Sequence, residues 1–294
     1  VELGDELMES WSKRDLPPET VRSGMVALSK IDPARYEAYF TKYLVSDDVP
    51  TRALAVSCRA LVPDPALFET FRSFVNDPEK EIVLVALNGL RKTPEGSVPK
   101  EGLVSYLSPS FLSADASVLE AALTLLGERS SEKEFEGALE VLTPLLSGKN
   151  QAGRMASANS LAKFCPAERL GELAMAQGFA GSWKVVGPFA NDRYNKGFTE
   201  SYEPETNWDA ANYKAKYRWE FGGGNDEREL ELGWTGTVPE NVEGEIHLAA
   251  KMPVPVKYAV AYAKTEILSD KDCEVRLSIV LREETAQSIW LNGK

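Results

Sequence analysis

The spacing of apolar residues divides the chain into a helical first part and a strand-like second part, and the change falls near Trp183. Before Trp183, apolar residues recur at steps of three and four, which places them on one face of a helix. After it, apolar and polar residues alternate over short runs, the period of a half-buried strand. Trp11 precedes the change, whereas Trp183 and the four later tryptophans follow it. The pattern predicts two modules.

A helical motif recurs five times in the first part, at intervals of 30, 29, 36 and 36 residues. Its five copies are Met25–Leu28, Ala55–Cys58, Leu84–Leu87, Glu120–Leu123 and Ala156–Asn159. A period of this length, made of two helices, is typical of an α-solenoid, because each repeat buries its apolar face only against its neighbours.

The second helix of each repeat is also visible in the sequence. Pro33–Phe40 and Pro65–Arg72 are alike, and proline at the first helical position loses no hydrogen bond. Asp32 and Asp64 precede these prolines and are expected to be N-caps. An apolar stripe at three- and four-residue steps predicts the buried face. Its members are Tyr36, Tyr39, Phe40, Tyr43, Phe68, Phe71 and Val75.

The paired helices, the first-helix pattern of Val83–Leu87 and the Asp-containing turns resemble the HEAT repeat family over residues 17–178. Armadillo and TPR-like repeats are the related alternatives. The resemblance implies a curved scaffold that offers its surface to a protein partner or a neighbouring domain, and it brings no catalytic residues. The alternative role is that the repeats only hold neighbouring domains apart.

The second part predicts an antiparallel β-sandwich or jelly roll made of short strands. Trp183–Val186 is expected to be a first strand that ends at Gly187, and Tyr213–Phe221 alternates cleanly between apolar and polar residues. Further strands are predicted at Gly244–Ala250, Tyr258–Leu268 and Cys273–Leu281. The run of apolar residues from Tyr258 favours a central strand.

The chain ends on Asn292-Gly293-Lys294, and Asn-Gly after an apolar strand is a strong hairpin signal. No returning strand follows, so we expect the chain to be a fragment of a longer protein and its sandwich to be incomplete. Trp183–Phe189, Tyr262–Ile267 and Ile289–Lys294 together resemble the galactose-binding-like jelly roll over residues 183–294. The resemblance implies a β-sandwich with carbohydrate-binding relatives, many of which accompany a catalytic domain.

The expected fold is therefore a multidomain α plus β chain, with a HEAT-like α-α solenoid over 1–180 and a galactose-binding-like sandwich over 181–294. The formal net charge of −12 and the absence of a basic stripe argue against nucleic acid as a partner. No apolar run approaches the ~20 residues that span a bilayer, so membrane insertion is not expected.

The candidate carbohydrate-binding residues are Asn191, Asp192, Tyr194, Asn195 and Trp208, all in predicted loops. They combine aromatic faces, which stack on a sugar ring, with amide and carboxylate groups for its hydroxyls. The alternative is that Trp208 and Tyr194 pack on the sandwich edge while Asn and Asp shape turns. A structural calcium, held by Asp192 with Asn191 or Glu205, is the only cofactor these oxygens suggest.

No catalytic residues are predicted. The three cysteines are far apart, which excludes a thiolate metal site, and His247 is the only histidine. Glu283-Glu284 and Asp270-Asp272 fall in turn-like segments typical of solvated charges. We expect a non-catalytic scaffold fragment of a larger bacterial protein that is periplasmic, cell-surface or secreted, with a carbohydrate-binding accessory module. The alternatives are the accessory region of an enzyme (a sugar dehydrogenase, hydrolase or transglutaminase-like protein) and a purely structural module.

Overall fold

A computed structural model describes residues 2–12, 16–62, 64, 67–93, 98, 102–191, 196–219, 226–268, 272, 274, 279, 288 and 289. The chain divides into two compact units, Val1–Gly178 and Phe179–Lys294, which we call the helical unit and the β unit. It is a mixed α and β protein, 55% helical. The described part contains twelve α-helices and two small antiparallel sheets, and no closed barrel.

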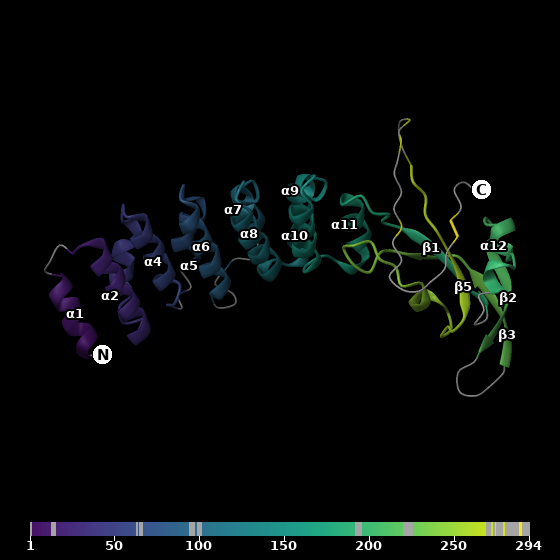
Figure 1. Cartoon of the computed structure of the whole chain (residues 1–294), viewed down its shortest axis with the longest axis horizontal. Coiled ribbons are helices and arrows are strands. Elements are labelled where there is room, and N and C mark those ends of the chain that lie inside the picture. The colour runs from purple at the N-terminus through teal and green to yellow at the C-terminus, as the bar shows by residue number, and fades with distance from the viewer. Residues whose placement is uncertain are drawn as a thin grey trace. The chain divides into compact units, whose positions relative to one another are not determined.

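Five helices stand side by side in chain order in the helical unit (Figure 1). They are α2 (Pro18–Ile31), α4 (Val49–Arg59), α6 (Lys80–Lys92), α8 (Ala116–Arg129) and α10 (Gln151–Ala162). Each contacts the next one in this series. The five copies of the recurring motif lie one in each helix, so the prediction of a helix at each copy is confirmed.

Further helices and 3-10 turns follow each of these five in the chain. They are α3 (Glu37–Lys42) with the 3-10 turn η1 (Tyr43–Val45), α5 (Leu67–Arg72) with η2 (Phe74–Asn76), α7 (Leu103–Phe111), η3 (Glu132–Glu134) with α9 (Phe135–Leu146), and η4 (Ala167–Arg169) with α11 (Leu170–Ala176). Each of α3, α5, α7, α9 and α11 contacts a helix of the series. The remaining helix, α1 (Glu2–Ser12), packs Trp11 against Tyr39 at a ring distance of 6.3 Å.

The apolar stripe predicted on the second helices forms part of the core. Phe40 and Phe71 are fully buried, and Tyr36, Tyr39, Phe68 and Val75 are buried as well. Tyr43 is half-buried, with its ring 5.1 Å from that of Tyr39. Because burying one such side chain stabilises the fold by about 1.5–3 kcal/mol, this stripe is a main source of cohesion between helices.

The expected N-cap at Asp32 is wrong. Asp32 ends α2 instead, and its side chain accepts a hydrogen bond from the backbone N–H of Arg35, 3.1 Å away. The residues from Pro33 onwards form a turn, so α3 begins only at Glu37. The carboxylate of Asp64 pairs with Arg59, and α5 begins at Leu67.

The described residues of the β unit form two sheets. In the first, β1 (Trp183–Ala190) lies between β4 (Thr235–Thr237) and β5 (Ala259–Lys264), antiparallel to both. In the second, β2 (Asn212–Trp219) pairs with β3 (Asp226–Gly233) in antiparallel register. The short helices η5 (Lys196–Phe198), α12 (Glu203–Thr206) and η7 (Leu248–Lys251) lie between strands.

The two sheets share one hydrophobic core. Val186 and Phe189 of β1 meet Tyr213 and Ala215 of β2 and Leu232 of β3. Along β2 the predicted alternation is confirmed from Tyr213 to Arg218, because Tyr213, Ala215 and Tyr217 are buried while Lys214, Lys216 and Arg218 are exposed. The end of the predicted strand, Glu220 and Phe221, lies outside the described residues.

Three strand predictions need correction. β1 does not end at Gly187 but continues to Ala190 through a bulge between Val186 and Phe189. The predicted strand Gly244–Ala250 is a turn followed by η7: the Asn241 side chain accepts from the N–H groups of Glu243 and Glu245, and Gly244 has a φ of 76°. β5 ends at Lys264 rather than Leu268, and in the described part it pairs only with β1.

β3 and β4 were not predicted. The predicted strand at Cys273–Leu281 and the end segment Ile289–Lys294 lie almost entirely outside the described residues.

Candidate binding site around Trp208

Of the five predicted carbohydrate-binding residues, the structure describes Asn191 and Trp208. Asp192, Tyr194 and Asn195 lie outside the described residues. Asn191 follows β1 directly, and Trp208 lies in the turn between α12 and β2.

Asn191 organises the start of its loop. Its backbone N–H donates to the carbonyl of Tyr258 at 3.1 Å, which extends the pairing of β1 with β5 by one residue. Its side-chain oxygen accepts a hydrogen bond from the N–H of Gly197 at 2.8 Å. That oxygen therefore holds two ends of a loop together, the role expected of an Asn that shapes a turn.

Trp208 lies against the ammonium group of Lys264. The Lys264 Nζ donates to the backbone carbonyl of Trp208 at 2.9 Å and lies 5.0 Å from the centroid of its ring. The same Nζ lies 4.3 Å from the ring centroid of Trp234. Its side chain is 18% exposed, so both contacts are made by a cation largely removed from water, where cation–π attraction is strong.

One side of the indole remains accessible. Trp208 is 45% exposed, and the carboxylate of the neighbouring Asp209, 80% exposed, lies 3.8 Å from Lys264. An exposed indole held in place by a cation, with a carboxylate beside it, can stack on an apolar ring face and accept hydrogen bonds from hydroxyls.

The two described residues of the predicted site are not brought together. Asn191 lies beside Tyr258, at the start of β5, whereas Trp208 contacts Lys264, at its end. Six residues of extended strand separate these positions, about 20 Å. The site predicted from the sequence therefore splits, and only Trp208 faces an accessible surface with polar groups beside it.

The segment from Tyr202 to Trp208 follows β5 along its length. The Tyr202 hydroxyl donates to the carbonyl of Ala190, and the Tyr262 hydroxyl donates to Glu205. Burial, and then the hydrogen bond to Glu205, raise the pKa of Tyr262, which keeps this hydroxyl protonated. These contacts fix the backbone that presents Trp208.

Glu205 was one of the expected calcium ligands. One of its carboxylate oxygens accepts from Tyr262 and the other accepts from the Ser201 hydroxyl at 3.0 Å. Both oxygens thus serve packing contacts. In the described part of the chain, no group of three or more His, Cys, Asp or Glu side chains is arranged to hold a metal ion.

The cysteine thiols and the histidine that the structure describes lie outside the Trp208 site. Cys58 is buried and burial raises its thiol pKa, while burial of Cys165 raises its pKa to about 11. Both thiols are thus held in the unreactive protonated form. His247 is 69% exposed, with Nδ1 3.4 Å from Glu240, as expected for a solvated imidazole.

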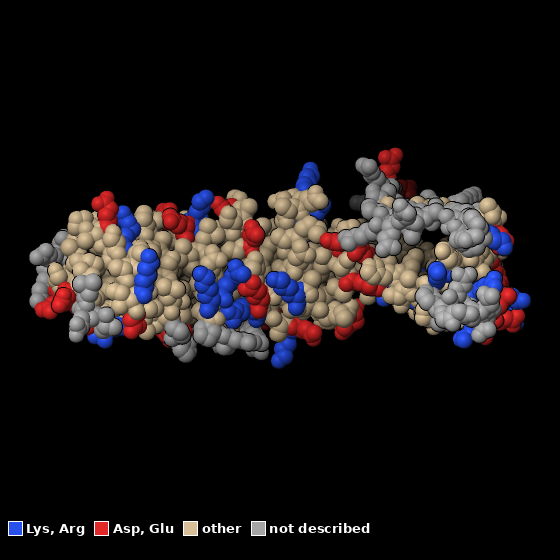
Figure 2. Space-filling model, turned by 60° about the horizontal axis from the view of Figure 1, so that its bottom comes forward, with Lys and Arg blue, Asp and Glu red and all other residues tan. Residues whose placement is uncertain are grey.

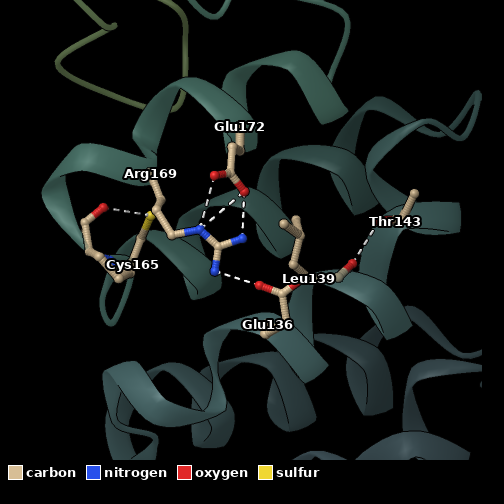
Figure 3. Close-up of polar contacts among 7 residues, drawn as sticks. Glu136, Leu139, Thr143, Cys165, Arg169 and Glu172 are labelled. Carbon is tan, nitrogen blue, oxygen red and sulfur yellow. Dashed lines mark hydrogen bonds and ion pairs between the residues drawn. The ribbon is translucent and has the colours of Figure 1, made fainter.

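In the helical unit a polar cluster surrounds Arg169 (Figure 3). Its guanidinium binds Glu172 through two nitrogens, reaches Glu136 of α9 at 2.6 Å, and stacks 4.8 Å from the Phe135 ring centroid. Hydrogen bonds to Glu172 and then Glu136 raise the Arg169 pKa. Since all three guanidinium nitrogens are engaged by carboxylates, the cluster joins α9 to α11 rather than offering a free charge.

A series of ion pairs links successive first helices. Arg22 of α2 pairs with Asp48 at 2.7 Å, Arg52 of α4 with Asp77 at 3.4 Å, and Lys80 of α6 with Asp115 at 2.9 Å. Asp48 and Asp115 are also the N-caps of α4 and α8. The carboxylates of Asp48 and Asp115 therefore each satisfy the start of one helix and hold the preceding one, whereas Asp77 holds α4 and accepts the N–H of Glu79 just before α6.

Charged side chains of both signs are interspersed on the face of the helical unit that Figure 2 shows. Among the described helices, none combines the length and the apolar character that a membrane span needs.

In comparisons with known proteins, no family model matches the chain and no curated protein is detectably similar to it.

Proposed function

We propose that the chain is a non-catalytic interaction scaffold, a HEAT-like α-solenoid over 1–180 followed by a galactose-binding-like β-domain over 181–294. The observation that carries the proposal is the repetition of one junction, in which α2, α4, α6, α8 and α10 each contact the next. A fold whose elements touch mainly their neighbours exposes a long surface relative to its size, which suits it to binding another protein.

Exposed apolar residues at matching positions support this role. Val45 is 84% exposed and Leu112 is 88% exposed. Each lies three residues before a helix N-cap, Asp48 and Asp115 respectively. Apolar side chains that recur at the same edge of a repeat row are suitable contacts for a protein partner.

For the β unit we propose a galactose-binding-like jelly roll that serves as an accessory carbohydrate-binding module. The shared core of its two sheets and the exposed indole of Trp208 favour this function. We further propose that the chain belongs to a larger, exported bacterial protein. A catalytic domain elsewhere in that protein, which these modules would position, is the alternative.

The scaffold function is tested with the full chain as bait. Captured proteins are purified and titrated against it by calorimetry, so that only saturable binding counts. We expect Val45→Glu with Leu112→Glu to weaken binding and Trp208→Ala to leave it unchanged. Failure to obtain any saturable protein complex, or dependence on Trp208 alone, contradicts the scaffold function.

A further inference from the structure

A groove of about 290 Å³ opens on the helical unit between the turn that precedes α6 and the turn that precedes α8. Val75, Pro78 and Val83 line one wall. Pro109 and Val118 line the other, together with the hydroxyl-bearing Ser110 and Ser113. The groove therefore offers two aliphatic walls with hydrogen-bonding groups on one of them.

The Ser110 hydroxyl has no hydrogen-bond partner among the described residues, although Ser110 is only 3% exposed. A helical serine ordinarily donates to a carbonyl three or four residues earlier, as Ser108 does to Ser105 at 2.9 Å. A buried polar group without a partner is unfavourable, so a ligand that supplies an acceptor or donor here gains more than it would at a satisfied hydroxyl.

The charged residues of the groove are already paired. Asp77 binds Arg52 of α4, and Lys80 binds Asp115, 2.9 Å away. A charged ligand would have to break one of these pairs or be buried without a counter-ion. The charge pattern of the groove thus complements an uncharged ligand.

We propose that this groove binds an extended, uncharged segment of a protein partner. One aliphatic side chain of the segment lies between the two aliphatic walls of the groove. One backbone group of the segment hydrogen-bonds to the Ser110 hydroxyl. We expect Leu112, which is highly exposed and directly precedes the groove residue Ser113, to add an apolar contact. This proposal rests on the scaffold function and specifies where its partner docks.

The probe is an array of uncharged octapeptides, acetylated and amidated at their ends, each with one Leu, Ile, Val or Phe among Ser, Gly and Gln. Peptides retained by the full chain are then titrated by fluorescence anisotropy. We expect peptides with an aliphatic residue to bind. Asn76→Trp, at an exposed position on the groove wall, should weaken binding at least about tenfold, since it fills the space for one side chain.

Two matched controls accompany this variant. Ser147→Trp changes an exposed residue at the corresponding turn before α10 and should leave peptide binding unchanged. Ser110→Ala should weaken binding about three- to tenfold through one lost hydrogen bond, whereas Ser157→Ala, which removes another buried hydroxyl without a partner, should not. Circular dichroism and the melting temperature confirm that each variant is folded.

If no peptide binds, or if Asn76→Trp has no effect on binding, the groove proposal is wrong. A purified protein partner that binds the chain with an affinity insensitive to Asn76→Trp would leave the scaffold function standing while overturning the groove as its docking site.

Discussion

The Lys264 ammonium lies 5.0 Å from the ring centroid of Trp208 and donates a hydrogen bond to its backbone carbonyl at 2.9 Å. The two residues are 56 positions apart in the chain. One lysine thus ties the turn before β2 to the end of β5 and holds the exposed indole in a single orientation.

Lys264→Met is expected to destabilise the β unit by about 1–2 kcal/mol, because it removes a largely buried cation–π contact and a hydrogen bond while keeping the length of the side chain. Urea unfolding followed by tryptophan fluorescence measures the change. Lys216→Met is the control. Lys216 is 67% exposed, and its Nζ comes no closer than 3.9 Å to the carboxylate of Glu229, so its ion pair is weak. Equal effects of the two variants would show that Lys264 does not hold Trp208.

The distance between Asn191 and Trp208 predicts that their variants separate binding from stability. Trp208→Ala should abolish any glycan binding seen on an array and change stability little beyond the lost Lys264 contact. Asn191→Ala should leave that binding intact but lower the free energy of unfolding by about 1 kcal/mol, because the N–H of Gly197 loses its acceptor. Loss of glycan binding in Asn191→Ala would show that the loop beginning at Asn191 belongs to the glycan-binding site.

Helices were predictable because their signal is local. The motif copies from Met25–Leu28 to Ala156–Asn159 carry the i, i+3, i+4 spacing within a few residues, and each lies in a helix. Helix starts were less predictable, since Asp48 caps α4 but Asp32 does not cap α3. The residues after Asp32 form a turn first, and a proline with a preceding Asp is compatible with either outcome.

Strands and the site depend on distant residues, and there the sequence reveals less. β3 was missed because Glu227, Glu229 and Glu231 make it look like a solvated charged run. It is a strand because Leu230 and Leu232 pair across from β2 and Leu232 enters the core. The role of Lys264 could not be predicted from its sequence neighbours either. It depends on contacts with Trp208 and Trp234, which lie near Lys264 only in the folded chain.

The Asp48 pair makes the stability of the helical unit depend on pH. The hydrogen bond from the Thr51 side chain, followed by the Thr51 N–H and Arg22, holds the Asp48 pKa below its ordinary value of 3.8 in the folded state. The stabilising contribution is therefore complete above the unfolded pKa and is lost as pH falls below about 3.8 through the folded pKa.

Asp48→Asn keeps a good N-cap but removes the charge. We expect the variant to be less stable than the natural chain at pH 6 and the difference in free energy of unfolding to shrink as pH falls from 5 to 2.5. Denaturant titrations across this range measure it, with the exposed Asp47→Asn as control. A difference that stays constant with pH would mean that Asp48 acts only through its cap.

Two helical glycines should respond in opposite directions to the same substitution. A Cβ on Gly89 of α6 would lie 2.7 Å from the Phe71 ring and 3.0 Å from the Ala60 Cβ, whereas one on Gly137 of α9 would meet nothing within 4 Å. Alanine favours a helix over glycine by about 0.8–1 kcal/mol. Gly137→Ala should therefore stabilise the helical unit by up to about 1 kcal/mol.

Gly89→Ala should instead destabilise it by about 1–3 kcal/mol, because Phe71 is fully buried and overpacking exceeds the gain in propensity. Urea unfolding of both variants followed by far-ultraviolet circular dichroism gives the two values on one scale. Stabilisation by Gly89→Ala would mean that α5 and α6 are not in close contact there. Because Ala60 follows α4 directly, the result would also count against the contact of α4 with α6, one of the repeated junctions on which the scaffold proposal rests.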